Sequence, residues 1–130
     1  MKKNAFTLIE LLAVITLLSV LVLITLTTVS RQVKQGKTDI YQEQLTTIKL
    51  AAQMWGSENK NLLSSYTECV SITLGKLRED GYVDEKLKNP ITDEIFKDDE
   101  IFVNITPKIK GYTYEISTDK DKMCPIFNQD

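Results

Sequence analysis

The fold of this chain is decided near its N-terminus by the run Ala5-Phe6-Thr7-Leu8-Ile9-Glu10-Leu11-Leu12-Ala13-Val14-Ile15. Apolar residues dominate well beyond this run, and Glu10 is the only charged side chain between Lys3 and Arg31. Residues 11–30 alone would make about 30 Å of helix, which is the thickness of the hydrocarbon core of a bilayer. The sequence therefore predicts a membrane-spanning helix that carries one ionisable group near its start.

The residues on either side of this helix indicate its orientation in the membrane and whether it is removed as a signal sequence. Lys2 and Lys3 precede the apolar run, so the positive-inside rule places the N-terminus in the cytoplasm and the rest of the chain outside. A cleaved secretory signal also has a basic start, but it is shorter and ends in a small-residue cleavage site. Ser30-Arg31-Gln32-Val33 offers no such site. We therefore expect the helix to be retained.

The basic start, the small residue Ala5 and the Phe-Thr-Leu-Ile-Glu sequence after it resemble the prepilin-type motif of type IV pilins and type II secretion pseudopilins. The resemblance implies that prepilin peptidase cuts between Ala5 and Phe6 on the cytoplasmic side, and that Phe6 is then N-methylated. Pilins usually have glycine before the cut, so Ala5 departs from the family pattern. Alanine is the next smallest residue, so we expect the cut to occur here as well.

The same resemblance implies an assembly role for Glu10. A carboxylate inside a spanning helix costs about 2.5–3.5 kcal/mol on insertion scales, so it needs a reason to be there. In family filaments the corresponding carboxylate neutralises the N-terminal ammonium of a neighbouring subunit, here that of Phe6. Loss of one partner of such a desolvated pair costs about 3–5 kcal/mol, which would select the axial register. A glutamate that rests at the lipid headgroups without a partner is the alternative.

Beyond Arg31 the apolar residues recur mainly at spacings of three and four, which is the pattern of an amphipathic helix. The members of this stripe are Val29, Val33, Gly36, Ile40, Leu45, Ile48, Ala52 and Trp55. Proline is absent from residues 30–55, so we expect one long helix from residue 6 to about residue 57. Two helices hinged at Gly36 are the alternative.

The remainder of the chain has weaker signals. Residues 56–61 predict an exit turn, and residues 72–83 predict a short second helix with Thr73 as its N-cap and Gly81 just after its end. Later segments, residues 100–106 and 112–118, are β-branched and aromatic with a turn-forming sequence between them, which predicts a hairpin.

We therefore expect an α+β protein with the pilin fold, in which a long N-terminal helix packs on a small C-terminal antiparallel sheet. The expected division is a leader at residues 1–5, a membrane-spanning assembly helix at 6–30, its amphipathic continuation at 31–57, and a globular domain at 58–130. A domain of roughly 70 residues rarely obtains more than about 3–5 kcal/mol from its core alone.

The resemblance also implies a disulfide, because many pilins tie down their C-terminal region with one. Cys69 and Cys124 are the only two cysteines, and the extracellular side permits their oxidation. Closing a loop of this length contributes about 4 kcal/mol in the chain-entropy model. Two buried free thiols are the alternative.

Composition argues against several other functions. The chain has no histidine, which excludes histidine metal sites and Ser-His-Asp or Cys-His catalysis. We expect no catalytic residues and no cofactor. The net charge is −2, which argues against nucleic-acid binding. The acidic stretch of residues 93–100 has ligands suited to calcium, as in some pseudopilins, but its spacing matches no EF-hand loop. A solvated loop is favoured, and no metal site is predicted.

The expected function is that of a structural subunit of an extracellular type IV pilus or pseudopilus. Its partners would be copies of itself, prepilin peptidase and the pilus assembly machinery. The chain would lie in the cell membrane as a single-pass protein before assembly, and at the cell surface afterwards. Major pilins, minor pilins, and competence or secretion pseudopilins all fit this pattern. A monomeric membrane-tethered extracellular binding module is the alternative from another class.

Overall fold

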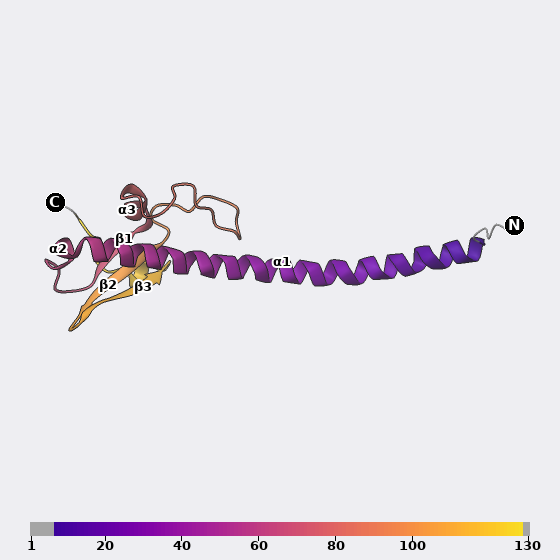
Figure 1. The fold of residues 1–130 in the computed structure, drawn as a ribbon, viewed down its shortest axis with the longest axis horizontal. Coiled ribbons are helices and arrows are strands. Elements are labelled where there is room, and N and C mark those ends of the chain that lie inside the picture. Colours follow the sequence, from indigo (N-terminus) through magenta and orange to yellow (C-terminus); the bar gives the residue numbers. More distant parts are fainter. Residues whose placement is uncertain (1–6, 129–130) are drawn as a thin grey trace. The chain divides into compact units, whose positions relative to one another are not determined.

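One helix, α1, is the longest element of the computed structural model, which describes residues 7–128 (Figure 1). It covers Leu8–Glu58, 51 residues, and passes through Gly36 without interruption. The prediction of one long helix is therefore confirmed for the described residues, and the alternative of two helices hinged at Gly36 is wrong. The chain forms two compact units, and the second begins at Thr38.

The second unit contains a three-stranded antiparallel sheet with the strand order β1-β2-β3. These strands are β1 (Val70–Thr73), β2 (Phe102–Lys108) and β3 (Gly111–Ser117). Strands β2 and β3 form a hairpin in which Phe102 pairs with Ser117. The predicted hairpin is confirmed, with small shifts at its ends.

The C-terminal part of α1 packs on this sheet (Figure 1). Ile48, Ala52 and Trp55 each expose 1% or less of their surface and belong to the apolar core that the described residues form. The other core members are Leu63, Val70, Ile72, Leu74, Leu77, Phe96, Ile101, Val103, Ile105 and Phe127. Ile40 belongs to the predicted stripe but is 48% exposed, so the packed part of the stripe begins further along. The expected α+β layout, a long N-terminal helix on a small antiparallel sheet, is confirmed.

The predicted exit turn at residues 56–61 is wrong at its start, because α1 continues through Gly56 to Glu58. Gly56 is buried, and a Cβ at this position would collide with the hydroxyl of Tyr114 on β3. The glycine therefore allows β3 to approach the helix closely and does not end it. The short helix α2 (Lys60–Leu63) follows.

The predicted helix over residues 72–83 is shorter than expected, because β1 takes its first two residues and only α3 (Leu74–Glu79) is helical. Its capping residues are those predicted. Thr73 accepts a hydrogen bond from the Lys76 N–H at 3.3 Å, and Gly81 has a positive φ of 83° just beyond the helix end. Strand β1 has four residues, too few for a recognisable alternation in the sequence.

Arg78 of α3 holds the long loop that leads from α3 to β2. Its side chain is only 7% exposed. Nη1 donates to the carbonyl of Phe96 at 2.6 Å and to Oδ1 of Asp98 at 2.8 Å. Nε and Nη2 donate to the carbonyls of Asp84 at 3.3 Å and Leu87 at 3.4 Å. One buried guanidinium thus fixes four points of the loop, and its charge is balanced by a carboxylate.

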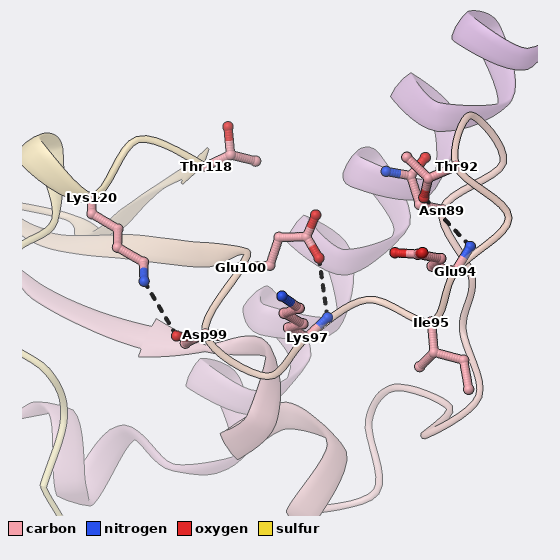
Figure 2. Close-up of a pocket in the computed structure, with 9 residues that line it drawn as sticks. All are labelled: Asn89, Thr92, Glu94, Ile95, Lys97, Asp99, Glu100, Thr118 and Lys120. Carbon is pink, nitrogen blue, oxygen red and sulfur yellow. Dashed lines mark hydrogen bonds and ion pairs between the residues drawn. The ribbon is translucent and has the colours of Figure 1, made fainter.

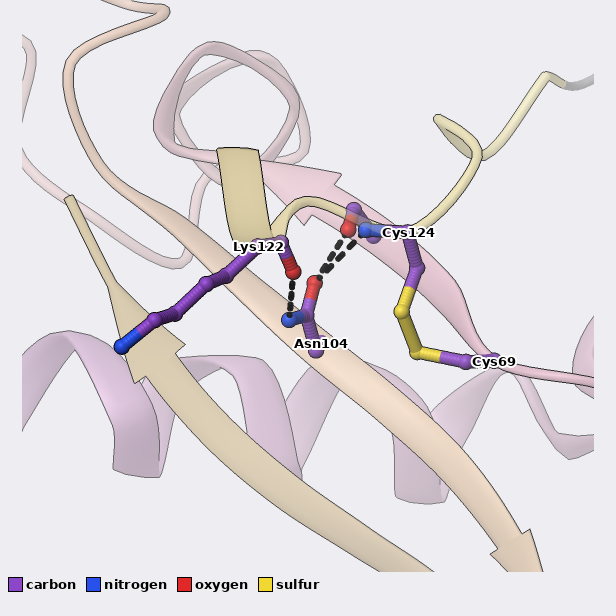
Figure 3. The surroundings of a disulfide bond; sticks show 5 residues. Cys69, Asn104, Lys122 and Cys124 are labelled. Atoms are coloured by element: carbon purple, nitrogen blue, oxygen red, sulfur yellow. Dashed lines mark hydrogen bonds between the residues drawn. A yellow bond between two sulfur atoms is a disulfide. The ribbon is translucent and has the colours of Figure 1, made fainter. Parts of the chain in front are cut away.

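Cys69 and Cys124 form a disulfide, with their Cα atoms 5.7 Å apart (Figure 3). Cys69 directly precedes β1, so the bond joins the start of this strand to the C-terminal segment. Asn104 of β2 supports the same connection. Its Oδ1 accepts the Cys124 N–H at 3.2 Å, and its Nδ2 donates to the carbonyl of Lys122 at 2.9 Å. A buried side-chain amide needs such partners, because an unpaired polar group in a core is costly.

The C-terminal segment continues as a short parallel partner of β1. Ser71 donates its N–H to the carbonyl of Pro125 and accepts the N–H of Phe127, each at 2.8 Å. Phe127 is then buried edge-on against Trp55, with ring centroids 5.0 Å apart. The disulfide and these contacts together join residues 124–127 to the packed face of α1.

Candidate assembly site

The predicted processing and assembly residues cluster at the start of α1. Ala5 and Phe6 lie outside the described residues. Glu10 lies in the first turn of α1, which begins at Leu8. The disulfide, by contrast, belongs to the second unit. Of the predicted site residues, the structure therefore describes only Glu10 at this place.

Thr7 and Glu10 cap the first turn of α1 reciprocally. The Thr7 N–H donates to Oε2 of Glu10 at 3.3 Å, and the Glu10 N–H donates to Oγ1 of Thr7 at 3.2 Å. This is the capping box, in which the N-cap residue and the third helical residue each satisfy a backbone donor of the other. The carboxylate also lies at the positive end of the helix dipole, which favours a negative charge there.

The sequence analysis assigns no role to Thr7, although the pattern that predicts one is present in the sequence. A threonine followed three residues later by glutamate, ahead of an apolar run, is the signature of a capping box. Glu10 is expected from the sequence only as one half of an intersubunit pair. The structure adds a contact within the subunit, in which the same carboxylate satisfies the start of its own helix.

Beyond the cap, α1 carries large apolar side chains on all sides. Each of those over residues 8–29 exposes between 47% and 88% of its surface. They are Leu8, Ile9, Leu11, Leu12, Val14, Ile15, Leu17, Leu18, Val20, Leu21, Val22, Leu23, Ile24, Leu26 and Val29. Within the part of the chain that the structure describes, α1 is the one helix long and apolar enough to cross a membrane. An apolar surface of this extent needs lipid or other helices around it.

The hydroxyl groups within this surface bond back to the helix. Thr16, Ser19 and Thr25 donate to the carbonyl four residues earlier, at 2.7, 2.8 and 2.7 Å. Thr27 and Thr28 donate to a shared carbonyl at 2.9 and 3.1 Å. Because each hydroxyl already has an acceptor, it needs none from lipid or from another helix. The surface is therefore more apolar than its sequence indicates.

A second candidate site is a hollow of about 400 Å³ in the second unit (Figure 2). Asp99 at its edge pairs with Lys120 at 3.2 Å, and this lysine holds the pKa of the Asp99 carboxyl below its usual value. Oε2 of Glu100 accepts the N–H of Lys97 at 3.1 Å. Among residues 7–128, no group of three or more acidic or cysteine side chains is arranged to hold a metal ion. The hollow therefore carries no assignment as a metal or catalytic site.

Residues 1–26 match the family model described as the prokaryotic N-terminal methylation motif. This motif is the signature of type IV pilins and pseudopilins, so the resemblance seen in the sequence is confirmed. The match includes Thr7 and Glu10 and extends over most of the apolar surface of α1. No curated protein and no solved structure matches the chain.

Proposed function

We propose that this chain is a structural, non-enzymatic subunit of an extracellular type IV pilus or pseudopilus, assembled through the N-terminal part of α1. The observation that carries the proposal is the methylation motif over residues 1–26, which coincides with a capped helix start and an exposed apolar helix. Packing against copies of the same helix would cover that apolar surface once the subunit leaves the membrane.

Processing would follow from the motif. Prepilin peptidase would cut between Ala5 and Phe6, and Phe6 would be N-methylated. Before assembly the subunit would span the membrane once with its N-terminus in the cytoplasm. The pilus assembly machinery would then move it into the filament at the cell surface. In this scheme residues 1–5 are the leader, 6–30 the assembly helix, 31–57 its continuation and 58–130 the globular domain.

The pairing of Glu10 with a neighbour follows from the charges at the start of the helix. Cleavage would leave an ammonium on Phe6, directly before the N-cap Thr7. The positive end of its own helix dipole disfavours a cation at that place, so the ammonium gains from a carboxylate on another subunit. Thr7 uses Oε2 of Glu10, and a carboxylate has a second oxygen that can accept an ammonium. The cap and the intersubunit pair are therefore compatible.

Such a pair would also select the axial register of the subunits. In an apolar helix bundle an unpaired ammonium or carboxylate costs about 3–5 kcal/mol. Sliding one subunit along another would separate the charges and incur that cost, whereas apolar side chains alone tolerate many offsets. Glu10 would thus act as the residue that specifies the position of each subunit.

The proposal is tested on filaments sheared from cells that express the full chain. Electron microscopy should show filaments, and mass spectrometry of their main component should give this chain, beginning at methylated Phe6. Cells that lack prepilin peptidase are the control, and they should retain an uncut chain in the membrane. A monomeric membrane-tethered binding module would instead stay in the membrane fraction and form no filament. That result would overturn the proposal.

A further inference from the structure

The tip of the β2–β3 hairpin carries an unusual surface. Ile109 in the turn is fully exposed, at 103% of its reference surface, and Lys108 and Lys110 flank it. The hairpin holds the tip in place through a continuous register from Phe102–Ser117 to Lys108–Gly111. A large apolar side chain between two cations, on a paired hairpin, suits a partner surface with an apolar centre and a carboxylate rim.

The hollow of Figure 2 lies at the opposite end of the same hairpin. Glu100 precedes β2 and Thr118 follows β3, and both line the hollow. A seven-residue strand separates the two ends by about 20 Å. Figure 1 likewise shows the hairpin tip pointing away from the loop that precedes β2. The tip therefore cannot reach the hollow of its own subunit.

The hollow contains an apolar side chain and carboxylates, which complement the isoleucine and the two lysines of the tip. Ile95 lines the hollow and is 49% exposed (Figure 2). Three carboxylates and two lysines also line it, a net charge of −1, and one of the lysines, Lys120, is paired with Asp99. The carboxylates of Glu94 and Glu100 are not part of that ion pair.

Residues 84–100 contain seven carboxylates and three lysines, a net charge of −4. The buried Arg78 holds this loop through the hydrogen bonds described above. The loop that forms most of the hollow is thus acidic, and its hydrogen bonds to Arg78 hold it in place without a partner.

We propose that the hairpin tip of one subunit docks on this hollow in a second copy of the chain. Ile109 would pack on Ile95, while Lys108 and Lys110 approach the carboxylates around it. The contact joins two different surfaces of identical chains, which is a head-to-tail interface, and such interfaces build open helical polymers. The inference rests on the proposed filament, and it identifies which globular surfaces would meet there.

The contact is tested by photo-cross-linking in the full chain. A benzophenone amino acid replaces Ile109, whose complete exposure makes the substitution tolerable for folding. After irradiation of assembled material, peptide mapping should find links between position 109 and residues 84–100 of another copy. The same amino acid in place of Thr113, an exposed residue in the middle of β3, is the matched control and should not give these links. Links from position 109 to lipid, to another protein or to α1 would overturn the contact.

A charge swap provides a second test. Lys108→Glu with Lys110→Glu places like charges across the contact and should lower the intersubunit cross-link about tenfold, since repulsion replaces attraction. Adding Glu94→Lys to the same chain should restore part of the yield. Adding Glu115→Lys, an exposed carboxylate on β3, should not. Equal rescue by both, or by neither, would contradict the pairing.

The outcomes separate this contact from the proposed function. If the wild-type chain forms no filament, the proposed function fails, whatever the cross-links show. If filaments form but their cross-links avoid residues 84–100, the contact alone is overturned.

Discussion

The Thr7 N–H lies 3.3 Å from Oε2 of Glu10, and the Glu10 N–H lies 3.2 Å from Oγ1 of Thr7. Glu10 therefore has a structural role inside the subunit in addition to the pairing proposed between subunits. The two roles need different chemistry. The cap requires an acceptor oxygen, which an amide also supplies. Neutralisation of an ammonium requires a negative charge.

Substitutions of Glu10 should separate these roles. Glu10→Gln keeps an acceptor for the Thr7 N–H but removes the charge, so the membrane level should stay normal while filaments disappear. Glu10→Leu removes both functions and should also abolish filaments. Its insertion should become easier, because the cost of a carboxylate in the apolar segment disappears. Glu10→Asp keeps the charge on a shorter side chain and should be intermediate. Filament yield by electron microscopy and membrane level by immunoblot are the measurements.

Thr7→Ala is the matched control for the cap. It removes the side-chain acceptor of the N-cap at a cost of about 1 kcal/mol to the helix start, but it keeps the carboxylate. Filament yield should fall less than in Glu10→Gln, and Thr7→Ser should behave like the wild type. Wild-type amounts of filament from Glu10→Gln would falsify the need for charge at this position.

Processing of the N-terminus is the second prediction. We expect the assembled protein to have an intact mass that corresponds to a chain beginning at Phe6 with one added methyl group. Ala5→Gly should be cut faster than the wild type, because glycine is the usual residue before the cut in the family that the motif resembles. A pulse-chase experiment with mass analysis measures both. A mature chain that begins at Met1 would contradict this prediction.

The disulfide should stabilise the C-terminal segment in particular. Replacing both Cys69 and Cys124 by serine should lower the free energy of unfolding by about 2–5 kcal/mol. Hydrogen exchange at the Phe127 N–H, which bonds to Ser71, should accelerate more than exchange within the β2–β3 hairpin. Non-reducing peptide mapping of the wild type should show the two cysteine peptides linked. Two freely alkylated thiols, or dimers linked through either cysteine, would refute the pairing.

Two glycines of α1 should respond in opposite ways to alanine. At Gly56 a Cβ collides with the side chain of Tyr114, so Gly56→Ala should destabilise the second unit by about 1–3 kcal/mol, as other overpacked cores do. At Gly36 no atom outside the helix backbone lies within 4 Å of a Cβ. Gly36→Ala should therefore stabilise the helix by up to about 1 kcal/mol.

Chemical unfolding of the full chain in detergent measures the effect at Gly56, with fluorescence of Trp55, the only tryptophan, as the probe. Gly36 lies in the first unit and Trp55 in the second, so the loss of helical circular dichroism measures the effect at Gly36. Gly56→Ala should cost less stability in a Tyr114→Thr background than in the wild type, because the shorter side chain leaves room for the new methyl. If Gly56→Ala were as stable as the wild type, the close approach of β3 to the helix would be wrong.

Elements that depend on local sequence patterns were predicted better than features that depend on contacts between distant parts of the chain. The long helix and the hairpin are set by local patterns, and both were predictable. The error at Gly56 has a different cause. A glycine near a helix end resembles a stop signal, and its true reason, the approach of Tyr114, comes from a residue far along the chain. Strand β1 was missed because its pairing with β2 is also a long-range contact.

The candidate site shows the same division between local and distant contacts. The capping box of Thr7 and Glu10 is written in four consecutive residues and could have been predicted from them. The back-bonding of the helix hydroxyls is equally local. The hollow around Ile95 depends on the buried Arg78 and on the register of two strands, so no short pattern indicates it.

Tyr114 should make the second unit sensitive to alkaline pH. Burial is the main cause that raises the pKa of Tyr114 above the ordinary value of 10.0, and the electrostatic effect of the neighbouring Tyr112 is the second cause. The folded state thus binds this proton more tightly than the unfolded state. Its contribution to stability is complete below about pH 10 and is lost as the pH rises through the raised pKa of the folded state. The urea concentration at the unfolding midpoint of the wild type should therefore decrease as the pH rises through that range. In Tyr114→Phe, which has no phenolic proton to lose, the decrease should be smaller.

Tyr82 acts in the same direction, because its hydroxyl donates to Glu58 and this hydrogen bond raises the pKa of Tyr82. The double variant with Tyr82→Phe should therefore be flatter still, and an unchanged alkaline slope in Tyr114→Phe would contradict the burial of this hydroxyl against α1.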